Sequence, residues 1–216
     1  EVLYGGVSLD RSVRRDVEGP EVARLLAEAA LRLGVDRLWD ADAREQLARR
    51  LAFAASNGLE VRPIDAPLLA EAVESLAVGA RGLADLRARS LVDAIVALEP
   101  PAALARLASF APETVSIPGR PRVAVTYEVD RPPWIESRLQ DFFGAKTGPA
   151  IADGRVPLTL HLLAPNQRAV QVTTDLAGFW DRHYPAIRKE LMRRYPRHAW
   201  PDDPRTAAPS RPKPRH

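Results

Sequence analysis

The chain has 216 residues, a formal net charge of +3 and no cysteine. This length can form one large domain or two small ones, and the lack of thiols excludes disulfides, thiolate zinc sites and a cysteine nucleophile. No uncharged apolar run reaches the roughly 18 residues of a membrane span, and no signal peptide pattern opens the chain, so we expect no membrane partner.

The first half of the sequence predicts helices. Residues 3–9 predict one short strand with no hairpin partner nearby. Apolar residues at helical spacing then predict helices over about 20–33, 41–55, 67–78, 90–98 and 102–110. Pro20 suits a first helical position, Gly34 a helix end, and Asp40 and Ser90 suit N-caps. We therefore expect residues 1–112 to form a mainly helical region.

The hydrophobic period changes from helical to alternating at residue 113. Alternation predicts strands over 113–117 and 123–129 and a hairpin from 156–162 to 170–172. Between them, Ile135, Leu139 and Phe142 predict a helix over 134–143. The fold class is thus α+β: a mainly helical N-terminal region, then a small, mainly antiparallel sheet covered by helices over 113–204. The proline-rich residues 205–216 predict a disordered basic tail.

The segment 170–204 combines aromatic and basic residues. Thr174 or Asp175 is expected to cap a helix whose apolar arc includes Trp180 and Tyr184. We expect Trp180, Tyr184 and Tyr195 to be core residues rather than base-stacking surfaces. Pro185 leaves two alternatives open, because it either interrupts one long helix or begins a second one. Arg182 shares a face with the later cations only in the first case.

Positive charge is concentrated at the end of the chain. Residues 182–216 carry ten Lys and Arg against three Asp and Glu, which gives +7 and leaves −4 on the other residues. A basic end on a mildly acidic body suggests a polyanionic partner, most often nucleic acid. The alternative on charge alone is a solvated tail that aids solubility.

Catalytic and metal motifs fail when tested against the sequence. Gly144-Ala145-Lys146-Thr147 lacks the glycine that a phosphate-binding loop places directly before its lysine. The four histidines show no metal-ligand spacing, and no Gly-x-Ser-x-Gly nucleophile pattern occurs. We therefore predict no catalytic, cofactor or metal site in this chain.

Ordered strings in the second half carry a family resemblance. Residues 131–146 and 154–204 resemble the C-terminal domain of HrpB-type bacterial DEAH-box ATP-dependent helicases. The matching motifs are Pro132-Pro133, 138–141 (RLQD), Phe143-Gly144, 154–157 (GRVP), 162–165 (LLAP), 170–173 (VQVT), 175–180 (DLAGFW), 184–189 (YPAIRK) and 194–204 (RYPRHAWPDDP). Upstream, residues 64–112 resemble the helical region that precedes this domain, and residues 1–55 resemble the end of an oligonucleotide-binding-fold region with its following helices.

The resemblance implies a parent protein that hydrolyses ATP and acts on RNA in the bacterial cytoplasm. The two RecA-like motor domains have no counterpart in this sequence, so ATP and magnesium are expected only there, and this chain alone is expected to be non-catalytic. Since the chain begins at Glu1 and not at a methionine, we expect it to be a fragment or a processed product.

The predicted role is an accessory one. We expect Lys189, Arg193 and Arg197 to contact the phosphates of a nucleic acid, which we take to be RNA, with Arg182 and Arg194 in support. The motor domains of the helicase are the other expected partner. The rival hypothesis is a structural or protein-docking module, in which the basic face is merely solvated and Trp134, Trp180, Tyr184 and Trp200 pack against the motor or another subunit.

Overall fold

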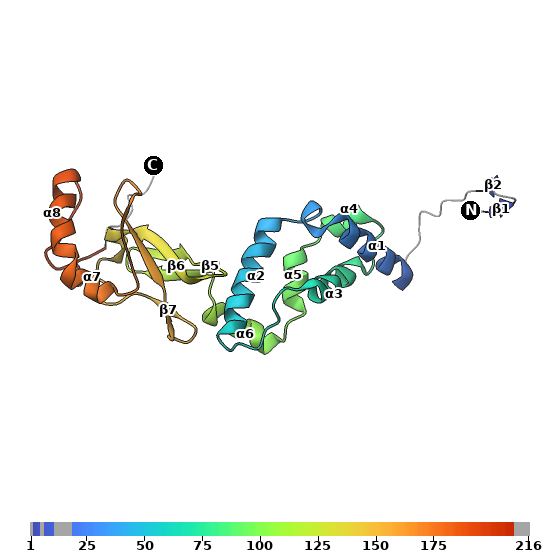
Figure 1. Ribbon diagram of the computed structural model, residues 1–216, viewed down its shortest axis with the longest axis horizontal. Coiled ribbons are helices and arrows are strands. Elements are labelled where there is room, and N and C mark those ends of the chain that lie inside the picture. The colour runs from blue at the N-terminus through green and yellow to red at the C-terminus, as the bar shows by residue number, and fades with distance from the viewer. Residues whose placement is uncertain (1, 5–6, 11–18, 210–216) are drawn as a thin grey trace. The chain divides into compact units, whose positions relative to one another are not determined.

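The structure, a computed structural model (Figure 1), describes residues 2–4, 7–10 and 19–209. The chain divides into two compact units: unit 1 is Glu1–Leu47 with Ile64–Glu99, and unit 2 is Ala48–Pro63 with Pro100–His216. Among the described residues, no helix combines the length and the apolar character needed to cross a membrane. The predicted domain limits at residues 112 and 204 stay a prediction, and the predicted tail beyond residue 209 lies outside the described residues.

Unit 1 contains mostly helices. Its elements are β1 (Val2–Tyr4), β2 (Val7–Asp10), α1 (Pro20–Leu33), the 3-10 helix η1 (Val35–Arg37), α3 (Ala66–Ala77), α4 (Leu83–Arg87) and α5 (Leu91–Ala97), while α2 (Ala41–Ser56) contributes to both units. The prediction of a single strand over residues 3–9 was wrong, because β1 and β2 pair with each other antiparallel. In the sequence, the Gly-Gly pair at positions 5 and 6 is a hairpin signal that the single-strand prediction overlooked.

Local signals explain where the helices of unit 1 begin and end. Pro20 is the first residue of α1, and Gly34 ends it at a φ of 91°, in the left-handed region that glycine adopts most readily. Asp65 Oδ1 accepts the N–H of Leu68 (2.9 Å) and so caps α3. The Ser90 hydroxyl caps α5 as predicted. α3 packs against both α1 and α5 and buries Ala72, Val73 and Ala77 completely. The predicted helices are confirmed, whereas α4 was not predicted.

Unit 2 contains the sheets. Its elements are α6 (Pro101–Phe110), β3 (Thr114–Ile117), β4 (Arg120–Ala124), β5 (Thr126–Glu128), β6 (Arg131–Arg138), the 3-10 helix η2 (Leu139–Phe142), β7 (Ala150–Ile151), β8 (Val156–Pro157), β9 (Thr159–Leu163), β10 (Ala169–Thr173), α7 (Leu176–Arg182) and α8 (Tyr184–Arg194). The main sheet has the order β10-β9-β6-β5, and β3-β4 and β7-β8 form separate pairs. Only β6 and β9 are parallel among these pairs, so the mainly antiparallel α+β fold is confirmed.

The predicted helix over residues 134–143 was wrong. Ile135 lies in β6, while Leu139 and Phe142 lie in η2. β6 is a central strand, paired antiparallel with β5 and parallel with β9, so its hydrogen bonds depend on segments distant in sequence. Pairing with β9 begins only at Trp134, past two prolines that lack an N–H donor. The predicted strand over residues 123–129 is also two strands, because the chain leaves β4 for β5 at Val125.

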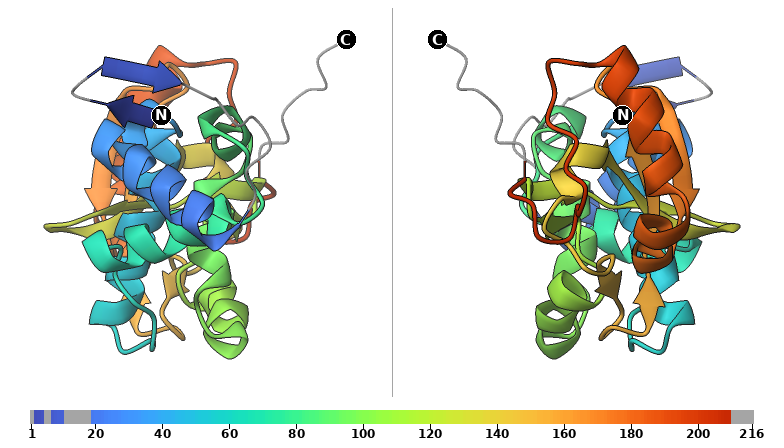
Figure 2. Two further views of the ribbon diagram at one scale, coloured as in Figure 1. Left: turned by 90° about the vertical axis from the view of Figure 1, so that its right-hand side faces the viewer. Right: turned by 90° about the vertical axis from the view of Figure 1, so that its left-hand side faces the viewer.

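An aromatic cluster joins α7 and α8 to the rest of unit 2. The buried Phe143 ring lies 6.2 Å from Trp180, 6.1 Å from Tyr184 and 6.5 Å from Trp200, measured between ring centroids. Trp180 also meets Phe179 at 5.1 Å. Figure 1 shows both helices beside the sheet, and Figure 2 shows that the chain changes direction between them. Trp180 and Tyr184 are therefore core, as predicted, whereas the same expectation for Tyr195 was wrong, because Tyr195 is half-buried and lies against Arg194.

A buried polar network holds the turn that presents Phe143. The Asp141 carboxylate is fully buried, accepts the hydroxyl of Ser137 (2.6 Å) and pairs with Arg138 (3.3 Å). Its backbone carbonyl accepts the N–H of Gly119 at 2.7 Å. A Cβ at position 119 would lie 2.6 Å from Asp141 Cα, so only glycine permits this approach.

The aromatic cluster gives the first prediction. Phe143→Ala should lower the free energy of unfolding of unit 2 by about 3–5 kcal/mol, because it removes a fully packed ring and leaves a cavity. Urea unfolding followed by tryptophan fluorescence measures the loss, since Trp180 and Trp200 lie against this ring. Val129→Ala is the control, because Val129 is 83% exposed and its loss should cost little. A loss under about 1 kcal/mol for Phe143→Ala would contradict the central position of this ring.

Candidate nucleic-acid interface

The final helical segment is two helices, which is one of the two alternatives that Pro185 left open. α7 ends at Arg182 and α8 begins at Tyr184, with Pro185 in the first turn of α8, where its missing N–H costs nothing. Asp175 caps α7 by accepting the N–H of Gly178 (2.8 Å), and it also accepts the Arg182 guanidinium (2.8 Å). These hydrogen bonds, the backbone one first, hold the pKa of Asp175 below its usual value. The Arg182 charge is thereby offset.

One side of α8 faces the core and carries a structural arginine. Tyr184 and Leu191 are buried on this side. Arg188, between them, donates its Nε–H to the carbonyl of Trp200 (2.8 Å) and pairs with Asp202 (2.8 Å). Arg188 therefore connects α8 to the segment that returns along it. The charge count in the sequence could not distinguish this arginine from its exposed neighbours.

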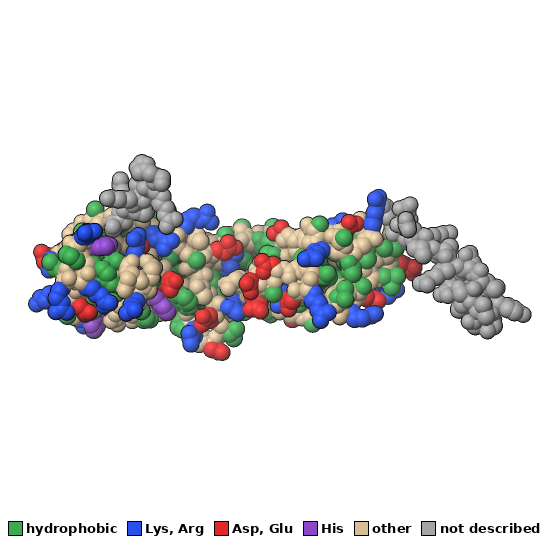
Figure 3. Space-filling model, turned by 90° about the horizontal axis from the view of Figure 1, so that it is seen from above, with side chains coloured by type: hydrophobic (Ala, Val, Ile, Leu, Met, Phe, Trp, Pro, Cys, Tyr) green, Lys and Arg blue, Asp and Glu red, His purple; other side chains and the backbone are tan. Residues whose placement is uncertain are grey.

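The other side of α8 carries the cations predicted to bind phosphate. Lys189 and Arg193 lie one turn apart and are exposed, and Arg197 is exposed in the turn that follows the helix. None of these three forms an ion pair with any residue that the structure describes. Figure 3 shows Lys and Arg side chains gathered around this part of unit 2, with histidines between them. We call Lys189, Arg193 and Arg197 the α8 cation patch.

The other predicted cations have partners. Arg194 lies over the ring of Tyr195 at 5.8 Å, in cation–π geometry. Arg182 lies on α7 and pairs with Asp175, so it does not share a helix face with the α8 cation patch. Arg205, counted in the basic tail, pairs with Asp181 and donates to the carbonyl of Ala177. Within unit 2 the structure therefore divides the basic run into exposed cations and cations that hold the fold.

The α8 cation patch has a structural alternative. Arg193 and Arg194 lie in the last turn of α8, where positive charge interacts favourably with the helix dipole. Lys189 lies in the middle of the helix and Arg197 lies beyond it, so the dipole does not account for them. Within the described part of the chain, no group of three His, Asp or Glu side chains could hold a metal ion.

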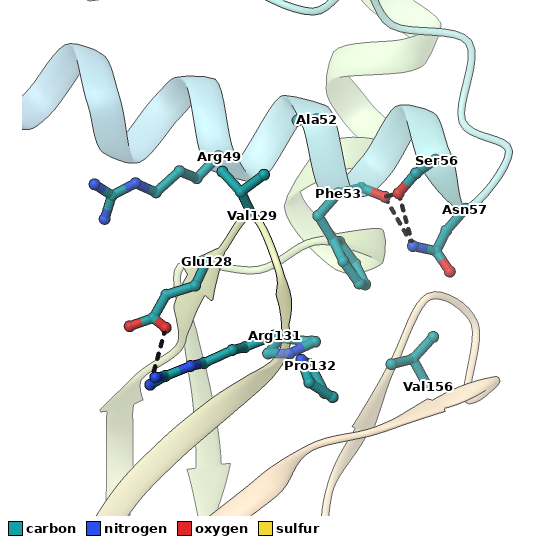
Figure 4. Close-up of a pocket in the computed structure, with 11 residues that line it drawn as sticks. Arg49, Ala52, Phe53, Ser56, Asn57, Glu128, Val129, Arg131, Pro132 and Val156 are labelled. Atoms are coloured by element: carbon teal, nitrogen blue, oxygen red, sulfur yellow. Dashed lines mark hydrogen bonds and ion pairs between the residues drawn. The ribbon is translucent and has the colours of Figure 1, made fainter.

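A second surface feature of unit 2 was not predicted from the sequence. A hollow of about 440 Å³ lies between the last turns of α2 and the turn from β5 to β6 (Figure 4). Arg49 and Phe53 line it from α2, and Arg131 lies opposite, paired with Glu128 at 3.5 Å. A smaller hollow of about 150 Å³ continues from Arg131 to Trp134 and His161. Because α2 and β6 are distant in sequence, no local pattern could reveal it.

This chain is similar to known proteins in sequence and in structure. The family described as ATP-dependent helicase C-terminal (HrpB_C) matches residues 73–204. The chain is 39% identical over 179 residues to the ATP-dependent RNA helicase HrpB of Escherichia coli (strain K12), which covers 80% of this chain and 22% of the relative.

Two solved structures share this fold. The crystal structure of the E. coli DExH-box NTPase HrpB matches with a TM-score of 0.80 and 34% identity, over 97% of this chain and 27% of that one. The crystal structure of the E. coli DEAH/RHA helicase HrpB matches with a TM-score of 0.69 and 33% identity, over 85% of this chain and 24% of that one. This chain thus spans about a quarter of the length of each relative.

The buried phenol under the α8 cation patch gives a pH prediction. Tyr184 donates its hydroxyl to the carbonyl of Pro201 (2.9 Å), and burial raises its pKa to about 12. The pKa of the Tyr184 hydroxyl is therefore higher in the folded chain than in the unfolded chain. The stability that the protonated hydroxyl contributes is complete below about pH 10 and is lost as the pH rises towards 12.

Comparison with Tyr184→Phe isolates that contribution. At pH 8 the variant should be about 1 kcal/mol less stable, because the hydrogen bond is gone. Near pH 11 the difference in unfolding free energy between the unmodified chain and the variant, which we call the gap, should shrink by roughly 1 kcal/mol. The reason is that ionisation of Tyr184 stabilises only the unfolded state of the unmodified chain. Urea midpoints at both pH values measure the gap. A gap of the same size at both would show that the folded phenol ionises normally.

Proposed function

Because this chain belongs to the family of C-terminal regions of HrpB-type ATP-dependent helicases, we propose that it binds nucleic acid, specifically RNA, next to the motor of such a helicase. ATP and magnesium are then bound by motor domains outside this sequence, and this chain catalyses no reaction by itself. The parent protein works in the bacterial cytoplasm. The contribution of this chain is affinity for the substrate strand.

The α8 cation patch carries the proposal. Lys189, Arg193 and Arg197 are exposed and lack acidic partners among the described residues, so their charges are available to a polyanion. The helix beneath them is fixed by Arg188 and by the aromatic cluster, so binding needs little ordering of the backbone. Arg194 extends the patch, and Arg182 is a flanking cation whose charge Asp175 offsets. Phosphate contacts of this kind are largely independent of base sequence.

Protein docking remains a second candidate function, on a different surface. Of the aromatic residues that the docking hypothesis assigned to a partner surface, Trp180, Tyr184 and Trp200 are buried within unit 2 and are not available to a partner. In unit 1, however, α1 exposes Leu25 and Leu33 to 58% and 42%. Leu25 and Leu33 stand eight residues apart and so lie on one stripe of α1, which offers an apolar surface to a partner. We propose α1 as the docking surface for the remainder of the helicase.

Charge reversal tests the nucleic-acid proposal. The triple variant Lys189→Glu/Arg193→Glu/Arg197→Glu should bind single-stranded RNA ten- to a hundredfold more weakly, as an order of magnitude, at low salt. Three lost phosphate contacts should also reduce the slope of log affinity against log salt by about 2. Fluorescence anisotropy with a labelled oligonucleotide at several salt concentrations measures both effects.

A matched control separates local contacts from total charge. Arg32, Arg37 and Arg87 are exposed cations of unit 1, and their triple reversal to glutamate changes the net charge by the same amount. This control should retain most of the affinity and most of the salt slope. Equal losses in the two triple variants would show that net charge alone drives binding. No binding by the unmodified chain at low salt would refute the proposal itself.

A further inference from the structure

Trp134 differs from the other three tryptophans of the chain. Each of the others donates its indole N–H to a backbone carbonyl: Trp39 to Arg89 (2.9 Å), Trp180 to Ala145 (2.9 Å) and Trp200 to Tyr195 (3.0 Å). Trp134 has no such acceptor among the residues that the structure describes, and its nitrogen is not buried. Its polar end is therefore open to water or to a ligand.

The Trp134 ring lies on the side of the sheet opposite the core. Along β6 its neighbours Pro133 and Ile135 are buried, whereas Trp134 is half-buried. It stacks on His161 of β9, with ring centroids 4.5 Å apart and planes within 14°. His161 also lies between two fully buried leucines, Leu160 and Leu162. Two aromatic rings are thus held together, with their planes almost parallel, on the side of the sheet that faces away from the core.

Two hollows of unit 2 meet beside this stack. The smaller, of about 150 Å³, is lined by Trp134, His161, Thr159, Pro132 and Arg131. The larger, of about 440 Å³, shares Arg131 and Pro132 and continues to Arg49 and Phe53 (Figure 4). A groove therefore runs from the aromatic stack past one arginine towards a second.

We propose that the Trp134–His161 stack is a base-stacking subsite for single-stranded nucleic acid, whose backbone follows the groove past Arg131. The inference rests on the proposed function and deepens it. Aromatic side chains bind unpaired bases through the π-face that every base has, and the indole N–H adds a free donor. A base paired in a duplex does not offer this face, so the subsite selects unpaired strands.

The charges around the groove determine where the phosphate of the bound nucleotide lies. Glu136 of β6 is opposite His161 in the parallel register and is exposed, so phosphates avoid the stack itself. Arg131 is 74% exposed, and its pairing with Glu128 is long at 3.5 Å. A phosphate can therefore compete for this guanidinium, which offers several donors in one plane. The base lies on the rings and the phosphate lies towards Arg131.

The test compares two labelled RNA 12-mers with the same number of phosphates, oligouridine and a fully abasic strand. Trp134→Ala should weaken binding of oligouridine by about 5- to 150-fold, the range for the loss of one stacked base. It should leave binding of the abasic strand and the salt slope unchanged, because no cation is lost. Trp134→Phe should retain most of the affinity. Val78→Ala, which removes an exposed apolar side chain from unit 1, should change nothing.

The outcomes separate this inference from the proposed function. If Trp134→Ala binds oligouridine as well as the unmodified chain does, or loses both strands equally, the stacking subsite is refuted while phosphate binding by the α8 cation patch stands. If the unmodified chain binds neither strand at low salt, the proposed function fails and the subsite with it. His161→Ala, read in the same assay, keeps the test decisive if Trp134→Ala does not fold, since loss of the supporting ring should also weaken oligouridine selectively.

Discussion

The burial of Phe143 is the constraint on which unit 2 depends. This ring follows directly after η2, and it contacts Trp180 of α7, Tyr184 of α8 and Trp200 of the returning segment. No two of those elements are joined by a ladder of backbone hydrogen bonds, so their mutual position is set by ring packing. The buried carboxylate of Asp141 and the absence of a side chain at Gly119 fix the turn that aims the ring. The hydrogen bonds of Asp141 thus position the ring around which the aromatic cluster packs.

The same packing determines which cations are available. Once Tyr184 and Leu191 face the core, helical spacing turns Arg188 towards the returning segment and Lys189 and Arg193 away from it. A single position along α8 separates the structural Arg188 from the exposed Lys189. Ion pairing follows the same division among the described residues, because Arg182, Arg188 and Arg205 have acidic partners and the α8 cation patch has none. Charge in this segment is therefore arranged by the core beneath it.

Local chemistry was predictable from the sequence, and non-local pairing was not. Caps at Asp40 and Ser90 and the end of α1 at Gly34 act within one turn of chain, so the sequence contains the whole signal. Pro185 left two alternatives, and the structure has two helices. The apolar spacing of Ile135, Leu139 and Phe142 fits a helix equally well as a strand followed by a 3-10 turn. What decides between them is β9, which arrives from more than twenty residues downstream and pairs in parallel. For the candidate interface, the sequence predicted that Lys189 and Arg193 share a helix face, and both are exposed on α8. The partners of Arg182 and Arg188 required tertiary contacts.

The tryptophans show why composition alone misjudges a binding surface. From the sequence, Trp134, Trp180, Tyr184 and Trp200 form one aromatic set in the protein-docking hypothesis, and composition does not distinguish among them. The structure divides them by one criterion, namely whether the indole N–H has a protein acceptor. A core tryptophan must satisfy that donor, because an unpaired buried N–H is costly, whereas a surface tryptophan can leave it to water or to a ligand. Trp134, whose indole N–H has no protein acceptor among the described residues, is therefore the tryptophan with the best case for a binding role. It stacks on His161 beside a groove lined by Arg131 and Arg49.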